Sequence, residues 1–211
     1  MHLKLNYYNN STIEQTGSMS NLITKTTELA MAVTLTYIKS GDTVVDATCG
    51  TGRDTLTLAK TVGAGGQVFA FDIQKKAIFL TEARLRTHGF SNVRLFHESF
   101  AEMSSHIPEN SAAAVVFNLG YLPGGDHKIT TTADTTLAGL ETAFSIIRPG
   151  GIVTVVLYDG HEEGAEEKKR ILERVRTLDS RKYHVAYVSL INQNNDPPEI
   201  LWITKKAKRR G

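Results

Sequence analysis

The segment from Asp46 to Thr55, which reads DATCGTGRDT, most constrains how this 211-residue chain can fold. It follows the apolar pair Val44-Val45, and a helix-like stretch from Leu56 to Lys60 comes after it. Gly50 and Gly52 can adopt backbone angles that are closed to other residues, and they leave no Cβ between the main chain and a ligand. Amides at the start of the next helix favour polar or anionic ligand groups. The segment therefore predicts a strand, a ligand-binding loop and a helix.

A second acid, Asp72, ends the next strand-like run, QVFAF, about 20 residues beyond the glycines. A carboxylate at that distance can accept hydrogen bonds from both hydroxyls of a ribose. The loop and Asp72 together predict a site for an adenosine cofactor. The residues expected to line it here are Asp46, Thr48, Cys49, Gly50, Gly52, Asp54, Thr55, Asp72 and Ile73.

The position of Asp46 distinguishes between two kinds of cofactor. The dinucleotide fingerprint reads G-x-G-x-x-G/A and needs no acid before it, whereas here Thr55 takes the third position and Asp46 precedes the loop. A carboxylate there would repel a pyrophosphate, but it can receive the ammonium of a methionine-like tail, directly or through water. S-adenosylmethionine therefore fits the loop better than NAD.

Length and charge suggest one domain spanning residues 1–211, without an apolar run that could cross a membrane. The 24 basic and 22 acidic residues argue against a generic nucleic-acid coat, so RNA would have to be held by local patches. One such patch is the short basic tail 205–211, which is also readable as a solvated terminus. The single cysteine excludes an internal disulfide, and no signal segment is recognisable, so a cytoplasmic location is expected.

Strand-like and helical runs alternate along the chain, beginning with an N-terminal helical segment at about residues 20–38. This alternation predicts an α/β fold with a doubly wound, Rossmann-like, mostly parallel sheet and helices on both faces. Only the last two strands follow each other without a helix, so an antiparallel edge is expected there. The expected strands end at residues 46, 72, 96, 118, 158, 191 and 204, and the later helices cover about 135–147 and 164–178.

In such a sheet the ligand lies beyond the carboxyl ends of the strands. After the third strand, Ser99 could bond an adenine edge and Phe100 could form an apolar wall, or the two could be a turn serine and a core phenylalanine. His97 and Glu98 lack a second ligand pair at metal spacing, so no metal is expected.

The fourth strand ends in Asn118, and a long turn, GYLPGGDH, follows it. Methyl transfer requires mainly that a nucleophile be aligned in line with the methyl group and that water be excluded. Asn118 could accept the hydrogens of an amine, and Tyr121 could lie against a planar base. Asp126 or His127 could take up a proton or could orient the loop.

Four segments of the chain resemble one family of small class I S-adenosylmethionine-dependent methyltransferases, the MnmM-like or rRNA-methylase family. They are the loop from Asp46 to Thr55, the stretch NLGYLPGGDH that starts at Asn118, the stretch YDGHEEG that starts at Tyr158, and residues 192–198. The resemblance extends over essentially the whole chain. Two positions depart from the family pattern, because Thr51 replaces an expected Asn and Glu163 replaces a Gly.

The resemblance implies a seven-stranded sheet with one reversed strand and S-adenosylmethionine as the cofactor. It also implies methylation of the amine of 5-aminomethyl-(2-thio)uridine at the wobble position in the tRNA anticodon loop. The substrate side would be lined by Asn118, Tyr121, Asp126, His127 and His161. Two alternatives remain open: the acceptor is rRNA or a small molecule, or the chain is a non-catalytic module that binds an adenosine ligand. A homodimer is a further possibility.

Overall fold

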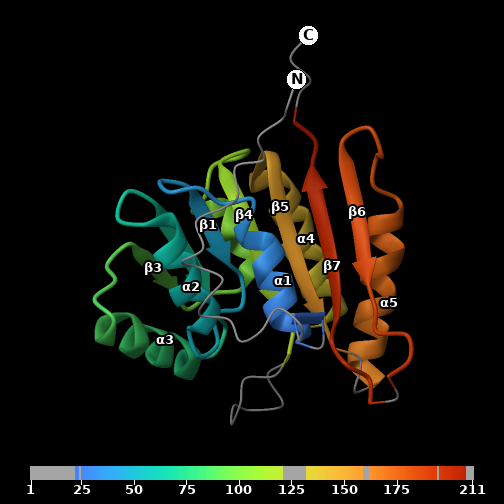
Figure 1. Ribbon diagram of the computed structural model, residues 1–211, viewed down its shortest axis with the longest axis horizontal. Helices are drawn as coiled ribbons and strands as arrows, with labels where there is room; N and C mark the ends of the chain where they lie inside the picture. The colour runs from blue at the N-terminus through green and yellow to red at the C-terminus, as the bar shows by residue number, and fades with distance from the viewer. Residues whose placement is uncertain (1–21, 24, 121–131, 159–161, 194, 208–211) are drawn as a thin grey trace, which may run out of the picture.

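The computed structural model describes residues 22–23, 25–120, 132–158, 162–193 and 195–207. Its centre is a seven-stranded sheet with the order β3-β2-β1-β4-β5-β7-β6 (Figure 1). The strands are β1 (Thr43–Asp46), β2 (Gln67–Phe71), β3 (Val93–Phe96), β4 (Ala112–Asn118), β5 (Ile147–Leu157), β6 (Tyr183–Val188) and β7 (Glu199–Lys205).

The expected α/β fold class, with a mostly parallel sheet, is confirmed. β4 pairs in parallel with both β1 and β5, and six of its seven residues, AAAVVF, are buried. A strand that is covered on both faces reads as a continuous apolar run, which is why the sequence marks β4 so clearly. Its one half-exposed residue is Asn118, at the carboxyl end.

Helices cover both faces of the sheet. Residues from α1 (Thr26–Leu35) and α2 (Arg53–Val62) pack with β1, β2 and β4 on one face. The other face is covered by the 3-10 helix η2 (Phe100–Ser105), α4 (Ala133–Ile146) and α5 (Glu162–Arg176). α3 (Lys75–Thr87) packs against α2 and β3 (Figure 1). The sheet and these helices position the loops that follow β1, β2, β3 and β4.

The sheet has one reversed strand, but that strand is not at the edge. β7 runs antiparallel to both β5 and β6 and lies between them, so β6 forms the edge. After β5 the chain passes through α5 to β6, which leaves one strand position open beside β5. β7 then runs back into that position. The sequence predicts the hairpin correctly, and the buried apolar run of β7 contrasts with the mostly exposed residues of β6, as expected for an inner and an edge strand.

The first helix is shorter than the expected segment 20–38. It runs from Thr26 to Leu35, and residues 36–38 form single turns instead, with bonds such as that from the Tyr37 N–H to the Thr34 carbonyl at 3.0 Å. The start of the expected segment lies outside the described residues. Among the described residues, no helix combines the length and apolar character needed to cross a membrane.

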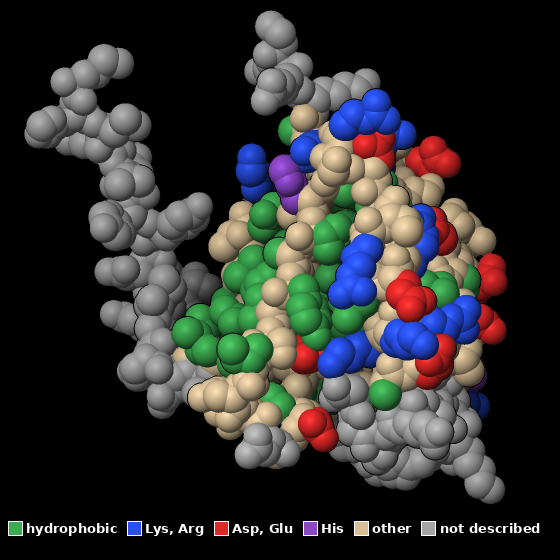
Figure 2. All heavy atoms as spheres, turned by 90° about the vertical axis from the view of Figure 1, so that its right-hand side faces the viewer, with side chains coloured by type: hydrophobic (Ala, Val, Ile, Leu, Met, Phe, Trp, Pro, Cys, Tyr) green, Lys and Arg blue, Asp and Glu red, His purple; other side chains and the backbone are tan. Residues whose placement is uncertain are grey.

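The side of the molecule that carries β6 and α5 has a mixed character (Figure 2). Basic and acidic side chains are interspersed there, and ion pairs such as Arg174–Glu141 and Arg170–Asp134 link α5 to α4. Val185 and Tyr187 on β6 are each 42% exposed. This interspersed charge does not form the single-sign field that draws nucleic acid to a surface.

Candidate cofactor and substrate site

Asp46 lies under the glycine loop rather than on its surface. It is 1% exposed, and its two carboxylate oxygens accept hydrogen bonds from the Thr55 hydroxyl at 2.6 Å and the Thr48 N–H at 3.2 Å. Thr55 is itself fully buried at the start of α2. These contacts tie the two ends of the loop together below its ligand side.

Asp72 holds the other side of the loop. One of its oxygens accepts a hydrogen bond from the Gly50 N–H at 3.0 Å, and the other accepts one from the Gln74 N–H at 2.9 Å. A carboxylate has about four acceptor positions, so further hydrogen bonds remain available to a ligand. Ile73, the next residue, is 41% exposed and presents an apolar side chain beside this carboxylate.

The glycine loop is packed against α3. Gly52 has a φ of +76°, and a Cβ built on it would lie 2.9 Å from the Cα of Thr81. The Thr81 hydroxyl donates to the Gly50 carbonyl at 3.2 Å, and the Arg84 Nε donates to the Thr51 carbonyl at 2.6 Å. Gly52 is therefore required by the contact with α3 as well as by its backbone angle, and Thr51, which departs from the family pattern, is held through its main chain.

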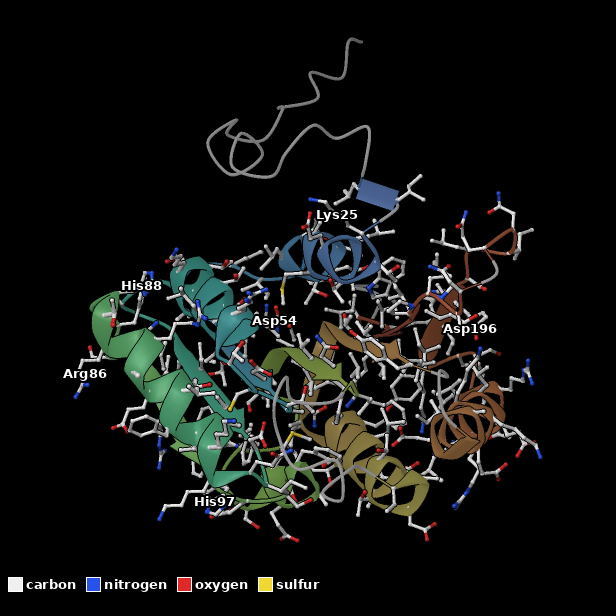
Figure 3. The ribbon with its side chains drawn as sticks, turned by 90° about the horizontal axis from the view of Figure 1, so that it is seen from below. Lys25, Asp54, Arg86, His88, His97 and Asp196 are labelled. Carbon is white, nitrogen blue, oxygen red and sulfur yellow. The ribbon has the colours of Figure 1, made fainter. Side chains whose placement is uncertain are left out.

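Asn118 is held at the carboxyl end of β4 through its main chain. Its backbone N–H donates to the Thr48 hydroxyl oxygen at 2.8 Å, and its side-chain amide acts to lower the pKa of the nearby Asp54 carboxyl. Asp54 belongs to the first turn of α2, yet no side chain caps that helix at Gly52. Figure 3 views this edge of the sheet, with Asp54 near its centre.

Three carboxylates lie close enough at this edge to influence one another. Burial and the charge of Asp54 raise the pKa of Asp46 to about 7, with a smaller contribution from Asp72. Burial also raises the pKa of Asp54, although the side-chain amide of Asn118 and the charge of Arg53 oppose the rise. Burial likewise raises the pKa of Asp72 against its two N–H bonds. An accumulation of acids like this favours a ligand that carries positive charge.

Three further residues of the predicted cofactor set are in structural positions. Cys49 is buried, and burial together with the Asp46 charge raises the pKa of its thiol. Ser99 caps η2, because its hydroxyl oxygen accepts the Ala101 N–H at 3.2 Å. Phe100 is 5% exposed and packs edge-on against Phe117 with a centroid distance of 5.4 Å. The geometry of the last two is that of a turn serine and a core phenylalanine.

Four of the expected substrate-side residues fall outside the described residues, namely Tyr121, Asp126, His127 and His161. Within the described part of the chain, no group of three or more His, Cys, Asp or Glu side chains is arranged to hold a metal ion. The structure thus brings Asp46, Asp54, Asp72 and Asn118 to one edge of the sheet.

Sequence reasoning missed the residues of α3 that support the loop. Thr81 interrupts an otherwise apolar buried stripe formed with Ala77 and Leu85. A threonine in the middle of such a stripe needs a hydrogen-bond partner, which was the available signal. Arg84 is one turn further along the same helix and has no comparable signal, because a half-exposed arginine on a helix usually faces solvent.

Comparisons with known proteins support the same fold. The family described as "Putative rRNA methylase" matches residues 68–204, and a protein-L-isoaspartate(D-aspartate) O-methyltransferase family matches residues 1–99, less than half of the chain. The crystal structure of a "putative rRNA-methylase" from Clostridium thermocellum is 42% identical, with a TM-score of 0.83 over 85% of this chain and 97% of that one.

Two other relatives are informative. A "putative methyltransferase" from Streptococcus mutans, solved in complex with SAH, is 29% identical with a TM-score of 0.77, over 85% of this chain and 97% of that one. A chloroplastic tRNA (mnm(5)s(2)U34)-methyltransferase from Arabidopsis thaliana is 46% identical over 153 residues. That alignment covers 68% of this chain but only 56% of the plant protein. By its family match and its full-length structural relative, the chain belongs to the rRNA-methylase family.

Proposed function

We propose that this protein is an S-adenosylmethionine-dependent methyltransferase that acts on the 5-aminomethyl group of (2-thio)uridine at the wobble position of tRNA. The observation that carries the proposal is the 46% identity to the Arabidopsis tRNA methyltransferase, which matches two thirds of this chain. The product would be 5-methylaminomethyl-(2-thio)uridine.

The residues at the loop edge fit S-adenosylmethionine. Asp72 keeps acceptor positions for ribose hydroxyls, and the exposed Ile73 offers an apolar surface for adenine. The carboxylates of Asp54 and Asp72 suit a cationic ligand with an ammonium group and a sulfonium centre. The related structure with bound SAH supports the same ligand class. When bound, the cofactor supplies an electrophilic methyl group.

The role proposed for Asn118 is to align the nucleophile. An amine attacks a methyl group only as a free base whose lone pair points along the axis of the breaking bond. A carbonyl oxygen at the end of β4 can accept one amine hydrogen and so fix the direction of that lone pair. Tyr121, Asp126, His127 and His161 are proposed to complete the substrate side.

An anticodon loop suits a domain of this size. Its unpaired bases can be turned outward and read individually, whereas a base inside a duplex would first have to be extracted. The charge of +2 over the whole chain does not by itself provide strong binding to a long RNA surface. We therefore propose that recognition relies on the modified base and the loop around it.

Ribosomal RNA is the second candidate substrate. The family description favours it, and so does a ribosomal RNA small subunit methyltransferase H from Koribacter versatilis that is 34% identical over 95 residues. That alignment covers only 42% of this chain and 30% of the relative, so it supports this candidate less than the plant relative supports the first.

A methyl-transfer assay separates the two candidates. The purified protein is incubated with labelled S-adenosylmethionine and with tRNA that carries 5-aminomethyluridine, unmodified tRNA, or small-subunit rRNA. We expect label in the first RNA alone. Label in rRNA would favour the second candidate, and label in no RNA would contradict both. The cytoplasmic location expected from the sequence stays a prediction, and a homodimer stays a possibility.

A further inference from the structure

We propose that the outer face of α3 holds the RNA strand beside the target base, with Lys75 and Arg86 at phosphate groups and Phe79 stacked on an unpaired base. The inference rests on the proposed function, and it names the part of the protein surface that the tRNA contacts. The observation that carries it is a phenylalanine, Phe79, that is 67% exposed on a basic helix bordering the cofactor loop.

The inner face of α3 is fixed to the site. The Arg84 Nε donates to the Thr51 carbonyl of the glycine loop at 2.6 Å. Just before the helix, the Ile73 carbonyl is hydrogen-bonded to the ring Nε2 of His97, the residue that follows β3, at 3.0 Å. Figure 1 shows α3 at the end of the molecule toward which β5 points. RNA on the outer face of α3 therefore lies next to the proposed cofactor and substrate site.

Four exposed side chains form a row along the outer face of α3, namely Lys75, Phe79, Glu82 and Arg86. They follow one another at intervals of three or four residues, which places them on one side of a helix. The row is about 16 Å long, because each helical residue adds about 1.5 Å. Arg86 lies on the outer side of α3 in Figure 3. A basic residue thus stands at each end of the row, with the aromatic ring between them.

The charges of α3 are not arranged to stabilise the helix. Lys75 and Lys76 occupy its first turn, where the partial positive charge of the free N–H groups disfavours cations. No acidic residue lies in that turn, and no side chain caps the helix there. The two lysines therefore weaken their own helix, whereas a polyanion on this face would compensate their charge.

The composition of this face matches single-stranded RNA better than a protein partner. α3 carries four basic residues against one acidic residue, whereas basic and acidic side chains are interspersed on the side of β6 and α5. Unpaired bases stack on aromatic rings, and lysine and arginine neutralise the neighbouring phosphates. A protein partner would require an apolar patch, but Phe79 is the only large apolar side chain that α3 exposes.

RNA binding measured as a function of salt concentration tests the proposal. A fluorescent anticodon stem-loop with 5-aminomethyluridine is titrated with the full chain in the presence of SAH. Lys75→Gln should lower the slope of log affinity against log salt by about 0.7–0.9, the change for one lost phosphate contact. Phe79→Ala should weaken binding by on the order of 5- to 100-fold at unchanged slope, because it removes one stacked base. Glu82→Gln should strengthen binding, since it removes the one acid of the row.

Matched variants separate stacking and charge from effects on folding. Phe79→Tyr should bind as the wild type does, whereas Phe79→Leu, which is apolar but cannot stack, should be as weak as Phe79→Ala. Lys75→Glu should lose RNA affinity with an equal or higher Tm, because an acid suits the first turn of a helix. Lys60→Gln in the last turn of α2 and Val185→Ala on β6 are the controls for an exposed lysine and an exposed apolar residue, and both should leave binding unchanged.

Methyl-transfer kinetics should show the same division. Phe79→Ala should raise the KM for tRNA while kcat changes by less than about threefold. Wild-type affinity and salt slope in both Lys75→Gln and Phe79→Ala would overturn the proposal. A Phe79→Ala variant with altered sedimentation but unchanged RNA affinity would also overturn it, because this face would then be a protein interface. If the wild type methylates ribosomal RNA and not tRNA, the proposed function fails, and the same variants titrated with that RNA decide whether α3 holds it.

Discussion

Asp46→Asn should make the protein more stable at high pH than the wild type. Asp46 is 1% exposed, and its pKa in the folded protein is raised to about 7 from an ordinary value of 3.8. The folded state therefore holds this proton more tightly than the unfolded state does. An asparagine can keep both hydrogen bonds, because its carbonyl accepts the Thr48 N–H and its NH₂ donates to the Thr55 hydroxyl oxygen.

The size of the effect follows from proton linkage. Well below pH 3.8 the raised pKa of Asp46 has no effect, because the carboxyl is protonated in both states. As the pH rises to about 7, the unfolded state loses the proton first and the free energy of unfolding falls. Each unit of pKa difference corresponds to about 1.4 kcal/mol, so the wild type loses about 4 kcal/mol by pH 8, of which about 2 kcal/mol is already lost at pH 5.

Urea unfolding at pH 5 and pH 8, followed by circular dichroism, measures this difference. Between these two pH values Asp46→Asn should gain about 2–3 kcal/mol relative to the wild type, with the same m-value. Asp179→Asn is the control. Arg181 lowers the pKa of Asp179 to about 2, so its stabilising effect is lost only as the pH falls below about 4. An Asp46→Asn effect that is equal at pH 5 and pH 8 would refute the reasoning.

Three further predictions concern the loop, the cofactor contact and the tail. Gly52→Ala should lower the free energy of unfolding by about 2–4 kcal/mol, because it adds a contact with Thr81 to an unfavourable φ; Gly89→Ala, with a φ of +72° and open space, should lose only the φ part in the same denaturation assay. Asp72→Ala should weaken S-adenosylmethionine binding by about 1.5–3 kcal/mol in calorimetric titration, and an unchanged affinity would remove Asp72 from the site. A chain ending at Ala207 should bind tRNA with the same affinity and salt dependence as the full chain. The tail begins at Lys205 and Lys206, which bond backbone carbonyls near the amino ends of β5 and β6, away from the carboxyl ends of the strands that form the site. A smaller salt slope for the shortened chain would show that the tail contacts phosphates.

The sequence predicts the central strands and the edge of the site well. β3 and β4 have the expected bounds, Val93–Phe96 and Ala112–Asn118, and β4 is recognisable by its buried apolar run AAAVVF. The carboxyl ends of parallel strands meet at one edge, so Asp46, Asp72 and Asn118 could be assigned to it from their positions alone.

The roles of the individual acids could not be predicted in the same way. Asp46 and Asp54 both flank the loop, but only the packing shows that Asp46 is buried and that the Thr48 hydroxyl meets the main chain of Asn118. That contact joins residues that are 70 positions apart in the sequence. Periodicity reports which face of an element is buried, and it carries no information on which polar side chains meet across two elements.

Nucleoside analysis of tRNA from a strain that lacks this protein tests the central claim most directly. Mass spectrometry should show that 5-methylaminomethyl-(2-thio)uridine disappears and that 5-aminomethyl-(2-thio)uridine accumulates. The wild-type gene should restore the methylated nucleoside, whereas a gene carrying Asn118→Ala should restore little of it. An unchanged tRNA nucleoside profile, together with the loss of a methyl group from ribosomal RNA, would contradict the account.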